Sequence, residues 1–357
     1  MLRSMYSGIS GMKVNQTKLD VIGNNIANVG TTSFKVSRVR FQDMLSQSAG
    51  KASGPALNTG GVNPKQVGLG VKLAGIDTVV YQGMMQPTSR NLDVAVDGEG
   101  YFMVAKGPRT FDNTSLVVDA NHELSGSSNL SIMYTRDGSF ILDTEGNLLT
   151  SDGYRVLGYS VSGNGMKPTG SGAGAASAVS SSIDASGNII FVDADSVSGT
   201  ASNLKANDGL KTLRIPEKIF VGSGTGSGAI QKRIISFSIE KDGLIKGVVE
   251  GGQVAVLGQI AMASFKNPAG LEKLGGNLYL NSANSGNAVV RSGIGTDPTK
   301  DNSKGYGDML QGMLEMSNVD LAEQFTDMIV ASRAFQASGK MISTGDEILQ
   351  DIINLKR

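Results

Sequence analysis

Hydrophobic residues recur every seven positions at both ends of the chain, and this spacing is lost in the middle. Near the beginning the repeat consists of Met5, Met12, Leu19 and Ile26, and Ile9 starts a companion row that continues through Gln16 and Gly23. Near the end it consists of Leu321, Met328, Phe335, Ile342 and Leu349, with Phe325 and Ile353 in a second row. Seven-residue repeats are typical of helices that pair along a narrow seam. They predict helices over residues 4–28 and 318–354, the second with Ser317 or Asn318 as N-cap and Asp320 in its first turn.

The middle of the chain has the pattern of β-strands. Short runs rich in Val, Ile, Phe and Tyr are separated by Asp-Gly, Glu-Gly-Asn and Ser-Gly-Asn turns, as in residues 92–105, 133–159, 187–194, 233–252 and 254–265. The sequence therefore predicts a mainly β protein whose α-helical terminal segments pair as a coiled coil.

Changes in composition predict four parts, each except the insertion built from two separate ranges. They are a helical domain (1–28 with 318–357), an extended connector poor in apolar residues (29–70 with 295–317), a β domain (71–159 with 233–294) and an inserted outer β domain (160–232). The insertion is bracketed by glycine- and serine-rich loops, which favour domain edges there.

The two predicted helices can bury their seams against each other or against other copies of the chain. Ordering about 60 residues costs backbone entropy, and the burial of about a dozen seam side chains offsets only part of that cost. Because the rows also contain Gln16, Gly23, Ser332, Gly339 and Asp346, a lone pair of helices is marginal. The pattern favours completion by neighbouring subunits over a self-sufficient domain.

Composition excludes several classes of chemistry. The chain has 32 basic and 32 acidic residues, no cysteine and one histidine, His122. No broad positive field is available for nucleic acid, and no thiolate nucleophile or multi-histidine metal cluster can form, so we expect no cofactor or metal. The beginning of the chain has no apolar core typical of a secretory signal, and no 18-residue apolar run occurs, so we expect no membrane anchor.

Three local motifs have simple alternatives to a catalytic or binding role. Gly224, Gly226 and Ala229 match a dinucleotide fingerprint, but the β-branched run that follows favours a flexible loop over a helix. The acidic runs 143–147, 184–188 and 192–196 lack the ligand set of a calcium loop, and hairpin turns explain the first two. His122 lies among polar residues and is interpreted as a solvated loop residue.

Both ends of the chain resemble the flagellar rod and hook proteins. The signature of that family appears as the run from Asn25 to Lys35, with Asn25, Ala27, Asn28, Thr31, Phe34 and Lys35 at the matching positions. Ser33 stands where the family usually has glycine. The C-terminal run LEMSNVDLAEQF and the β segments LDVAVDGEGYFMV and YTRDGSFILDTEGN also match the family's shared segments.

The resemblance implies a structural protein that is not an enzyme. It implies a homopolymeric tube of paired terminal helices around an export channel, contacts with other axial proteins (distal rod, hook cap and hook–filament junction), and unfolded export by the type III apparatus. The long insertion favours a subunit of the extracellular hook over the alternative, a distal rod subunit. From other classes, a β-rich surface adhesin and a glycan-acting enzyme with two carboxylates remain open.

Overall fold

The computed structural model describes residues 2–55, 60–107, 116–119, 121–125, 131–164, 178–184, 187–194, 204–221 and 230–355. Contacts divide the chain into two compact units. Unit 1 comprises Met1–Tyr81 with Ser317–Arg357, and unit 2 is Gln82–Met316. The helices belong to unit 1 and most strands to unit 2, so the predicted fold class, mainly β with terminal helices that pack together, is confirmed.

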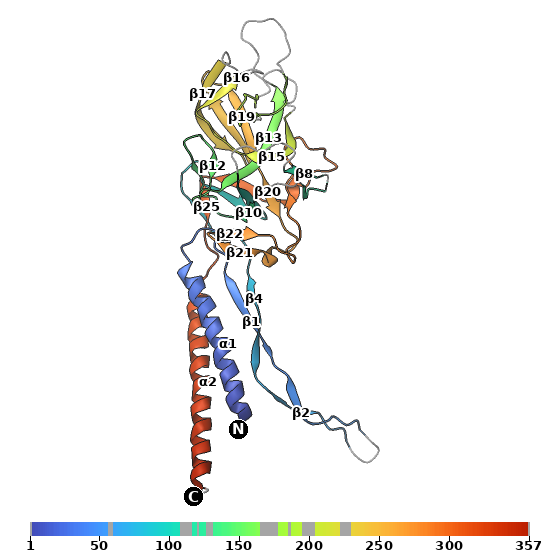
Figure 1. Ribbon diagram of the computed structural model, residues 1–357, viewed down its shortest axis with the longest axis vertical. Coiled ribbons are helices and arrows are strands. Elements are labelled where there is room, and N and C mark those ends of the chain that lie inside the picture. The colour runs from blue at the N-terminus through green and yellow to red at the C-terminus, as the bar shows by residue number, and fades with distance from the viewer. Residues whose placement is uncertain are drawn as a thin grey trace. The chain divides into compact units, whose positions relative to one another are not determined.

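Unit 1 is a pair of long helices with a β-ribbon beside them (Figure 1). Its elements are α1 (Leu2–Ala27), β1 (Ser37–Asp43), β2 (Ser46–Gly50), β3 (Lys65–Gly68), β4 (Val71–Thr78) and α2 (Leu321–Leu355). The helices are antiparallel, because Lys18 of α1 pairs with Asp327 near the start of α2, whereas Met5 lies beside Gly345 near its end. Among the described residues, neither helix is long and apolar enough to cross a membrane.

Short polar side chains end α1 and begin α2. Asn28 Nδ2 donates to the carbonyl oxygen of Asn24 at 2.9 Å, so an amide side chain satisfies a carbonyl at the helix exit. Asp320 is the N-cap of α2, because its Oδ1 accepts from the backbone N–H groups of Ala322 at 2.8 Å and Glu323 at 3.3 Å. The prediction of Ser317 or Asn318 as N-cap is therefore wrong, since the helix begins at Leu321, three residues later than predicted.

A two-stranded ribbon runs along α1. β1 pairs with β4 from Ser37↔Thr78 to Asp43↔Val71, and β2 continues the pairing with β3. Asn25 bonds to the backbone of Ser37 at one end of α1, and Ser10 Oγ accepts from the N–H of Val71 at 3.3 Å nearer the other. The ribbon therefore extends from the end of α1 toward its beginning.

Unit 2 contains most of the strands. They are β5 (Met85–Pro87), β6 (Val94–Asp97), β7 (Tyr101–Lys106), β8 (Val117–Val118), β9 (Leu124–Ser125), β10 (Ser131–Thr135), β11 (Ile141–Leu142), β12 (Leu148–Leu149), β13 (Arg155–Asn164), β14 (Ala178–Val179), β15 (Lys205–Thr212), β16 (Lys218–Val221), β17 (Ile230–Ile239), β18 (Leu244–Val249), β19 (Val254–Ile260), β20 (Met262–Ser264), β21 (Glu272–Gly275), β22 (Leu278–Leu280), β23 (Val289–Val290), β24 (Asp308–Gln311) and β25 (Met313–Glu315). The 3₁₀ turns Pro268–Gly270 and Ser303–Gly305 interrupt them. Within the described residues the ladders between these strands are antiparallel, and β13 pairs with β7, β12, β14, β15 and β19.

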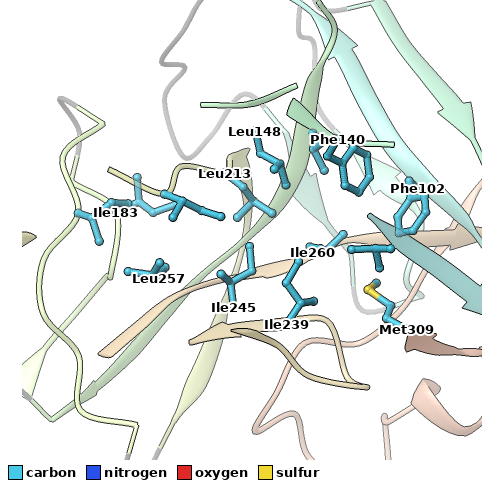
Figure 2. Close-up of a cluster of buried hydrophobic side chains, with 14 of the residues drawn as sticks. Phe102, Phe140, Leu148, Ile183, Leu213, Ile239, Ile245, Leu257, Ile260 and Met309 are labelled. Atoms are coloured by element: carbon cyan, nitrogen blue, oxygen red, sulfur yellow. The ribbon is translucent and has the colours of Figure 1, made fainter. Parts of the chain in front are cut away.

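One hydrophobic core extends through unit 2 (Figure 2). Phe102 and Phe140 pack edge to face at one end of this core, and Ile183 and Leu257 belong to the same cluster. A smaller cluster around Val161, Val192 and Val256 includes residues of β13, β18 and β19. Residues of the range 160–232 thus share core packing with residues outside it.

The contacts group the chain differently from the predicted four parts. The ribbon, which begins inside the predicted connector, belongs with the helices in unit 1. β24 and β25 lie in the second connector range, yet they pair with β6 and β5 of unit 2. Unit 2 is not subdivided at residues 160 and 232. The polar composition of residues 29–70 and 295–317 predicted an extended connector. Instead, strands within these ranges form cross-strand hydrogen bonds that attach them to unit 1 or to unit 2.

A buried ion pair fastens the two ends of unit 2. The chain enters and leaves this unit through neighbouring strands, with the N–H of Met316 donating to the carbonyl of Met84 at 2.9 Å. Arg136 Nε lies 2.9 Å from Glu315 Oε2, and both side chains are almost fully buried. Arg136 also donates to the carbonyl of Gly98 at 2.8 Å, and Glu315 Oε1 accepts from the N–H of Gly83 at 2.9 Å.

An aromatic cluster that includes Tyr101, Tyr134 and Tyr279 lies beside this pair. Burial raises the pKa of Tyr134 from 10.0 to about 12, and burial, opposed by Arg136 and aided by Glu315, raises the pKa of Tyr279 to about 12. A phenol whose pKa is raised by folding stabilises the fold below its unfolded pKa, and this contribution is lost as pH rises toward the folded value. We expect the near-UV circular dichroism of unit 2 to collapse between about pH 10 and pH 12.

The matched variants separate buried from exposed tyrosines. Tyr134→Phe should move the alkaline transition to higher pH, whereas Tyr6→Phe, at a side chain 69% exposed, should leave it unchanged. Equal behaviour of the two variants would show that burial of Tyr134 does not control the transition.

Candidate functional site

The residues of the family-like motif join α1, the ribbon and α2 through buried polar contacts. Asn25 is 1% exposed, and its amide donates to Ser37 O at 2.9 Å and to Gln324 Oε1 at 3.0 Å. Lys35 is also 1% exposed and donates to the carbonyl of Tyr81 at 2.9 Å. These side chains place the start of the ribbon against both helices.

Asn318, three residues before α2, completes this polar network. Its Oδ1 accepts from the N–H of Val36 at 2.8 Å, and its Nδ2 donates to the carbonyls of Val79 and Tyr81 at 2.9 and 3.1 Å. The Tyr81 hydroxyl donates back to the Asn318 carbonyl at 3.0 Å. We call Asn25, Lys35, Tyr81, Asn318 and Gln324 the polar clamp.

The other motif residues surround the turn between α1 and the ribbon. Asn28, Thr31 and Phe34 are half-buried, and Ala27 is exposed. Ser33 is buried and has a left-handed backbone with φ 55°. The turn therefore keeps a positive φ although serine replaces the usual glycine, a conformation that costs a residue with a Cβ about 1–2 kcal/mol.

Small residues allow α1 and α2 to approach closely. A Cβ added at Gly8 would lie 3.3 Å from Ile342 Cγ1 and 3.4 Å from the Ser338 carbonyl oxygen. One added at Gly11 would lie 3.1 Å from Ser338 Oγ. Farther along the pair, Lys18 Nζ lies 3.2 Å from Asp327 Oδ1, an ion pair that closes the side of the interface.

The structure divides the predicted seam residues between the helix contact and solvent. Half-buried members are Met5, Met12, Leu19, Ile26, Met328, Ile342 and Leu349. Exposed members are Ile9 (37%), Leu321 (40%), Phe325 (50%), Phe335 (38%) and Ile353 (66%). Some predicted positions thus lie between the helices, whereas others form an uncovered surface.

The most buried contact rows of the two helices differ from the predicted hydrophobic rows. On α2 this row is Gln324, Ala331, Ser338 and Gly345, which also recur every seven residues. On α1 it includes Gly8 and Ile22, of which Ile22 is 3% exposed. Apart from Ile22, the residues named in these rows are small or polar, so the seven-residue spacing of small side chains is the signal that could have found them.

Gly8 and Gly23 form a matched pair for testing close helix packing. Gly8→Leu should lower the melting temperature of the helices, because its side chain would force α2 away. Gly23→Leu should raise helix stability by about 1 kcal/mol, since an added Cβ at Gly23 meets nothing within 4 Å and leucine is the better helix former. The far-UV circular dichroism melt of the monomer measures both, and a Gly8→Leu variant as stable as Gly23→Leu would contradict the packing argument.

Of the three acidic runs, the first is a hairpin turn. β11 and β12 pair around residues 143–147, and the Asp143 carboxylate accepts from the N–H groups of Glu145 and Asn147. Burial is the largest single influence on the pKa of the Asp143 carboxyl and raises it. The hydrogen bonds from the Asn147 side chain and from the two N–H groups, with the charge of Arg155, together outweigh burial and hold this pKa below its ordinary value. Asp184 and Asn188 also close a turn, although part of the runs 184–188 and 192–196 lies outside the described residues.

The remaining candidates can be placed only in part. Gly224, Gly226 and Ala229 lie outside the described residues. His122 is half-buried with φ 61°, and its carbonyl accepts from the N–H of Val290 at 2.8 Å, so its loop is tied to β23 and is less solvated than predicted. In the described ranges, no three His, Asp or Glu side chains are grouped so that they could hold a metal ion.

Comparison with known proteins identifies three family segments. The model described as "Flagella basal body rod protein" matches residues 5–35, "Flagellar hook protein FlgE/F/G D1 domain" matches 95–247, and "Flagellar basal body rod FlgEFG protein C-terminal" matches 310–355. The first segment contains nearly all of α1 together with the motif, and the last contains the whole of α2.

Relatives match along the whole chain. The chain is 40% identical to the flagellar basal-body rod protein FlgG of Bacillus subtilis and 31% identical to the flagellar hook protein FlgE of Borreliella burgdorferi, with all of each chain covered in both comparisons. A crystal structure of the Helicobacter pylori flagellar hook protein FlgE2 has 12% identity and a TM-score of 0.37, covering 65% of this chain and all of that one.

The chain therefore belongs to the family of flagellar rod and hook proteins, the structural proteins of the flagellar axis. Its relatives include both rod proteins and hook proteins, so membership places it in the rod or the hook of a flagellum.

Proposed function

We propose that this protein is a structural subunit of the flagellar hook, which polymerises into a flexible tube that transmits torque and encloses an export channel. The observation that carries the proposal is the uncovered apolar surface of α2. Phe325 is 50%, Ile329 63%, Val330 57% and Ile352 46% exposed in the single chain. Large apolar side chains left exposed along a helix favour an interaction surface, and other copies of the helical pair would cover them.

The predicted seam residues have two roles in this proposal. Half-buried members such as Met12 and Ile342 hold α1 to α2 within a copy, and exposed members such as Phe325 and Ile353 contact other copies. The polar clamp fixes the ribbon to the helices so that each copy presents the same surface. Further proposed partners are the distal rod, hook cap and hook–filament junction proteins and the type III export apparatus.

Removal of the C-terminal helix tests the polymer. Deleting residues 318–357 should leave a β-rich monomer that forms no tubes in electron micrographs, whereas the full chain forms curved tubes.

Phe325→Ser with Ile329→Ser should abolish tubes while the monomer keeps its helical circular dichroism. Ile230→Ser with Ile235→Ser, at unit 2 side chains 67% and 69% exposed, is the matched control and should assemble normally. Normal hooks from the deletion variant would refute the proposal.

A distal rod subunit is the second candidate, because the relative with 40% identity is a rod protein. The length of the segment 160–232 does not separate the two candidates, because the rod relative aligns with this chain over 357 residues with all of both chains covered. Immunogold labelling of intact cells separates the two: label outside the envelope supports the hook, and label that appears only after the outer layers are removed supports the rod.

A structural role also predicts what loss of the outer segment does. Removal of residues 160–232 from an adhesin would abolish ligand binding and leave motility normal, and an enzyme would lose turnover of a glycan substrate. We expect instead that hook shape or motility changes, scored by swimming assays and micrographs of isolated hooks.

A further inference from the structure

Two surfaces of unit 1 carry opposite charges and uncovered apolar side chains. The first, the distal ribbon, is residues 41–51 with 62–73, and its charged residues are Lys51, Lys65, Lys72 and Asp43. The second, the acidic end of α2, is residues 341–355, and its charged residues are Asp346, Glu347 and Asp351. Lys356 and Arg357 follow in the sequence, outside the described residues.

The charged side chains of both surfaces are available for a partner. The three lysines and three acids are all exposed. Within the described ranges, none of the six lies within 4 Å of an opposite charge; Asp346 accepts one hydrogen bond, from Gln350 at 3.3 Å. Among the described residues, each surface therefore carries charges of one predominant sign.

Both surfaces also expose hydrophobic side chains. The distal ribbon exposes Leu45 (82%), Val62 (51%), Val67 (50%), Phe41 (40%), Met44 (40%) and Leu73 (40%). The acidic end of α2 exposes Leu355 (86%), Ile353 (66%), Met341 (51%), Ile352 (46%) and Ile348 (44%). A two-stranded ribbon by itself is marginally stable in water, so a cover for its apolar side chains would stabilise it.

The two surfaces lie toward the same end of unit 1. The ribbon runs along α1 toward the beginning of that helix, and antiparallel packing brings the end of α2 to the same level. α2 continues for ten residues after Gly345, which lies beside Met5, whereas only a few residues of α1 precede Met5. In Figure 1 the end of α2 accordingly extends past the beginning of α1.

We propose that the distal ribbon of one copy docks on the acidic end of α2 in a laterally neighbouring copy of this chain. Side-by-side copies in register bring the two surfaces to the same height, apolar side chains cover one another, and lysines meet carboxylates around them. The ribbon would thus act as a strap that joins one helical pair to the next. This inference rests on the proposed polymer and names one contact within it.

Charge exchange tests the contact without touching the buried structure. Lys51→Glu, Lys65→Glu and Lys72→Glu together should raise the critical concentration for tube assembly about tenfold, because three exposed attractions become repulsions. Asp346→Lys, Glu347→Lys and Asp351→Lys together should have a similar effect. A chain that carries all six changes should regain assembly, since the charges are then exchanged. Wild-type assembly should also weaken as salt screens the pairs.

The control is a triple reversal at exposed lysines of unit 2, Lys218→Glu, Lys241→Glu and Lys266→Glu, which should assemble as the wild type does. The docking is overturned if both the lysine triple variant and the carboxylate triple variant assemble normally, or if the variant with all six changes is as defective as either triple. In both cases the proposed polymer itself is unaffected. If the wild-type chain forms no tubes, the proposed function fails and the docking fails with it.

A disulfide cross-link provides an independent readout. The natural chain has no cysteine, so Val67→Cys with Ile352→Cys introduces one defined pair. Mild oxidation should give a ladder of cross-linked chains in assembled tubes and only single chains in dilute monomer. Val67→Cys with Ile235→Cys, which links the ribbon to an exposed site in unit 2, should give no ladder. Equal ladders from the two pairs would overturn the docking.

Discussion

Glu315→Ala is expected to destabilise unit 2 by about 3–5 kcal/mol, because removal of one partner leaves the other charge buried and unpaired. Arg136 would keep its hydrogen bonds to Val96 and Gly98 but lose the carboxylate 2.9 Å from its Nε. The N–H of Gly83 would also lose its acceptor. Urea unfolding followed by near-UV circular dichroism measures the change.

Two control variants test whether the loss of stability comes from a buried, unpaired charge. Glu217→Ala removes a carboxylate from an ion pair in which both side chains are more than two-thirds exposed, and should cost at most about 1 kcal/mol. The double variant Arg136→Met with Glu315→Leu should recover much of the loss, because no charge remains buried. Similar losses for Glu315→Ala and Glu217→Ala would mean that burial of the pair contributes nothing.

Asn318→Ala should destabilise unit 1 by about 3 kcal/mol. The change leaves the Val36 N–H and the carbonyl of Val79 without their side-chain partner, and the carbonyl of Tyr81 loses one of its two donors. Buried polar groups left unsatisfied each cost about 1–3 kcal/mol. The helical far-UV melt of the monomer reports the loss, and the same variant should assemble poorly because the ribbon is no longer fixed.

Tyr81→Phe is the graded control for the polar clamp. It removes only the hydroxyl that donates to the Asn318 carbonyl at 3.0 Å, so it should cost about 1 kcal/mol. Asn318→Asp keeps an acceptor for Val36 but places a carboxylate against two carbonyl oxygens, and should be the worst of the three at neutral pH. An Asn318→Ala variant no weaker than Tyr81→Phe would show that the clamp does not stabilise unit 1.

The strands and helices followed closely from local pattern. Alternating Val, Ile and Phe residues with Gly-containing turns indicated the strands around 94–106 and 230–260, and cross-strand pairing forms them there. Seven-residue spacing indicated both helices within three residues of their bounds. These features depend on neighbours in sequence, which is why a single sequence reveals them.

Contacts between distant segments were harder to predict. Gly8, Ala331 and Ser338 lie at the helix contact because they are small, and hydrophobic periodicity gives no weight to small residues. The sequence predicts Asn318 as a helix cap, because a cap needs only neighbouring residues. Its actual partners, Val36 and Val79, lie more than 230 residues away in the sequence, where local pattern gives no signal. The resemblance identified Asn25 and Lys35, but only the fold shows that their side chains connect three elements.

The close entry and exit of unit 2 have a consequence for protein engineering. Met84 and Met316 are joined by a 2.9 Å hydrogen bond, so the ends of the intervening segment nearly meet. A few glycine and serine residues could bridge Tyr81 and Ser317 and yield a miniature chain of two helices and a ribbon. The same junction would accept a foreign domain whose own termini are adjacent, so cargo could be displayed at every repeat of an assembled array.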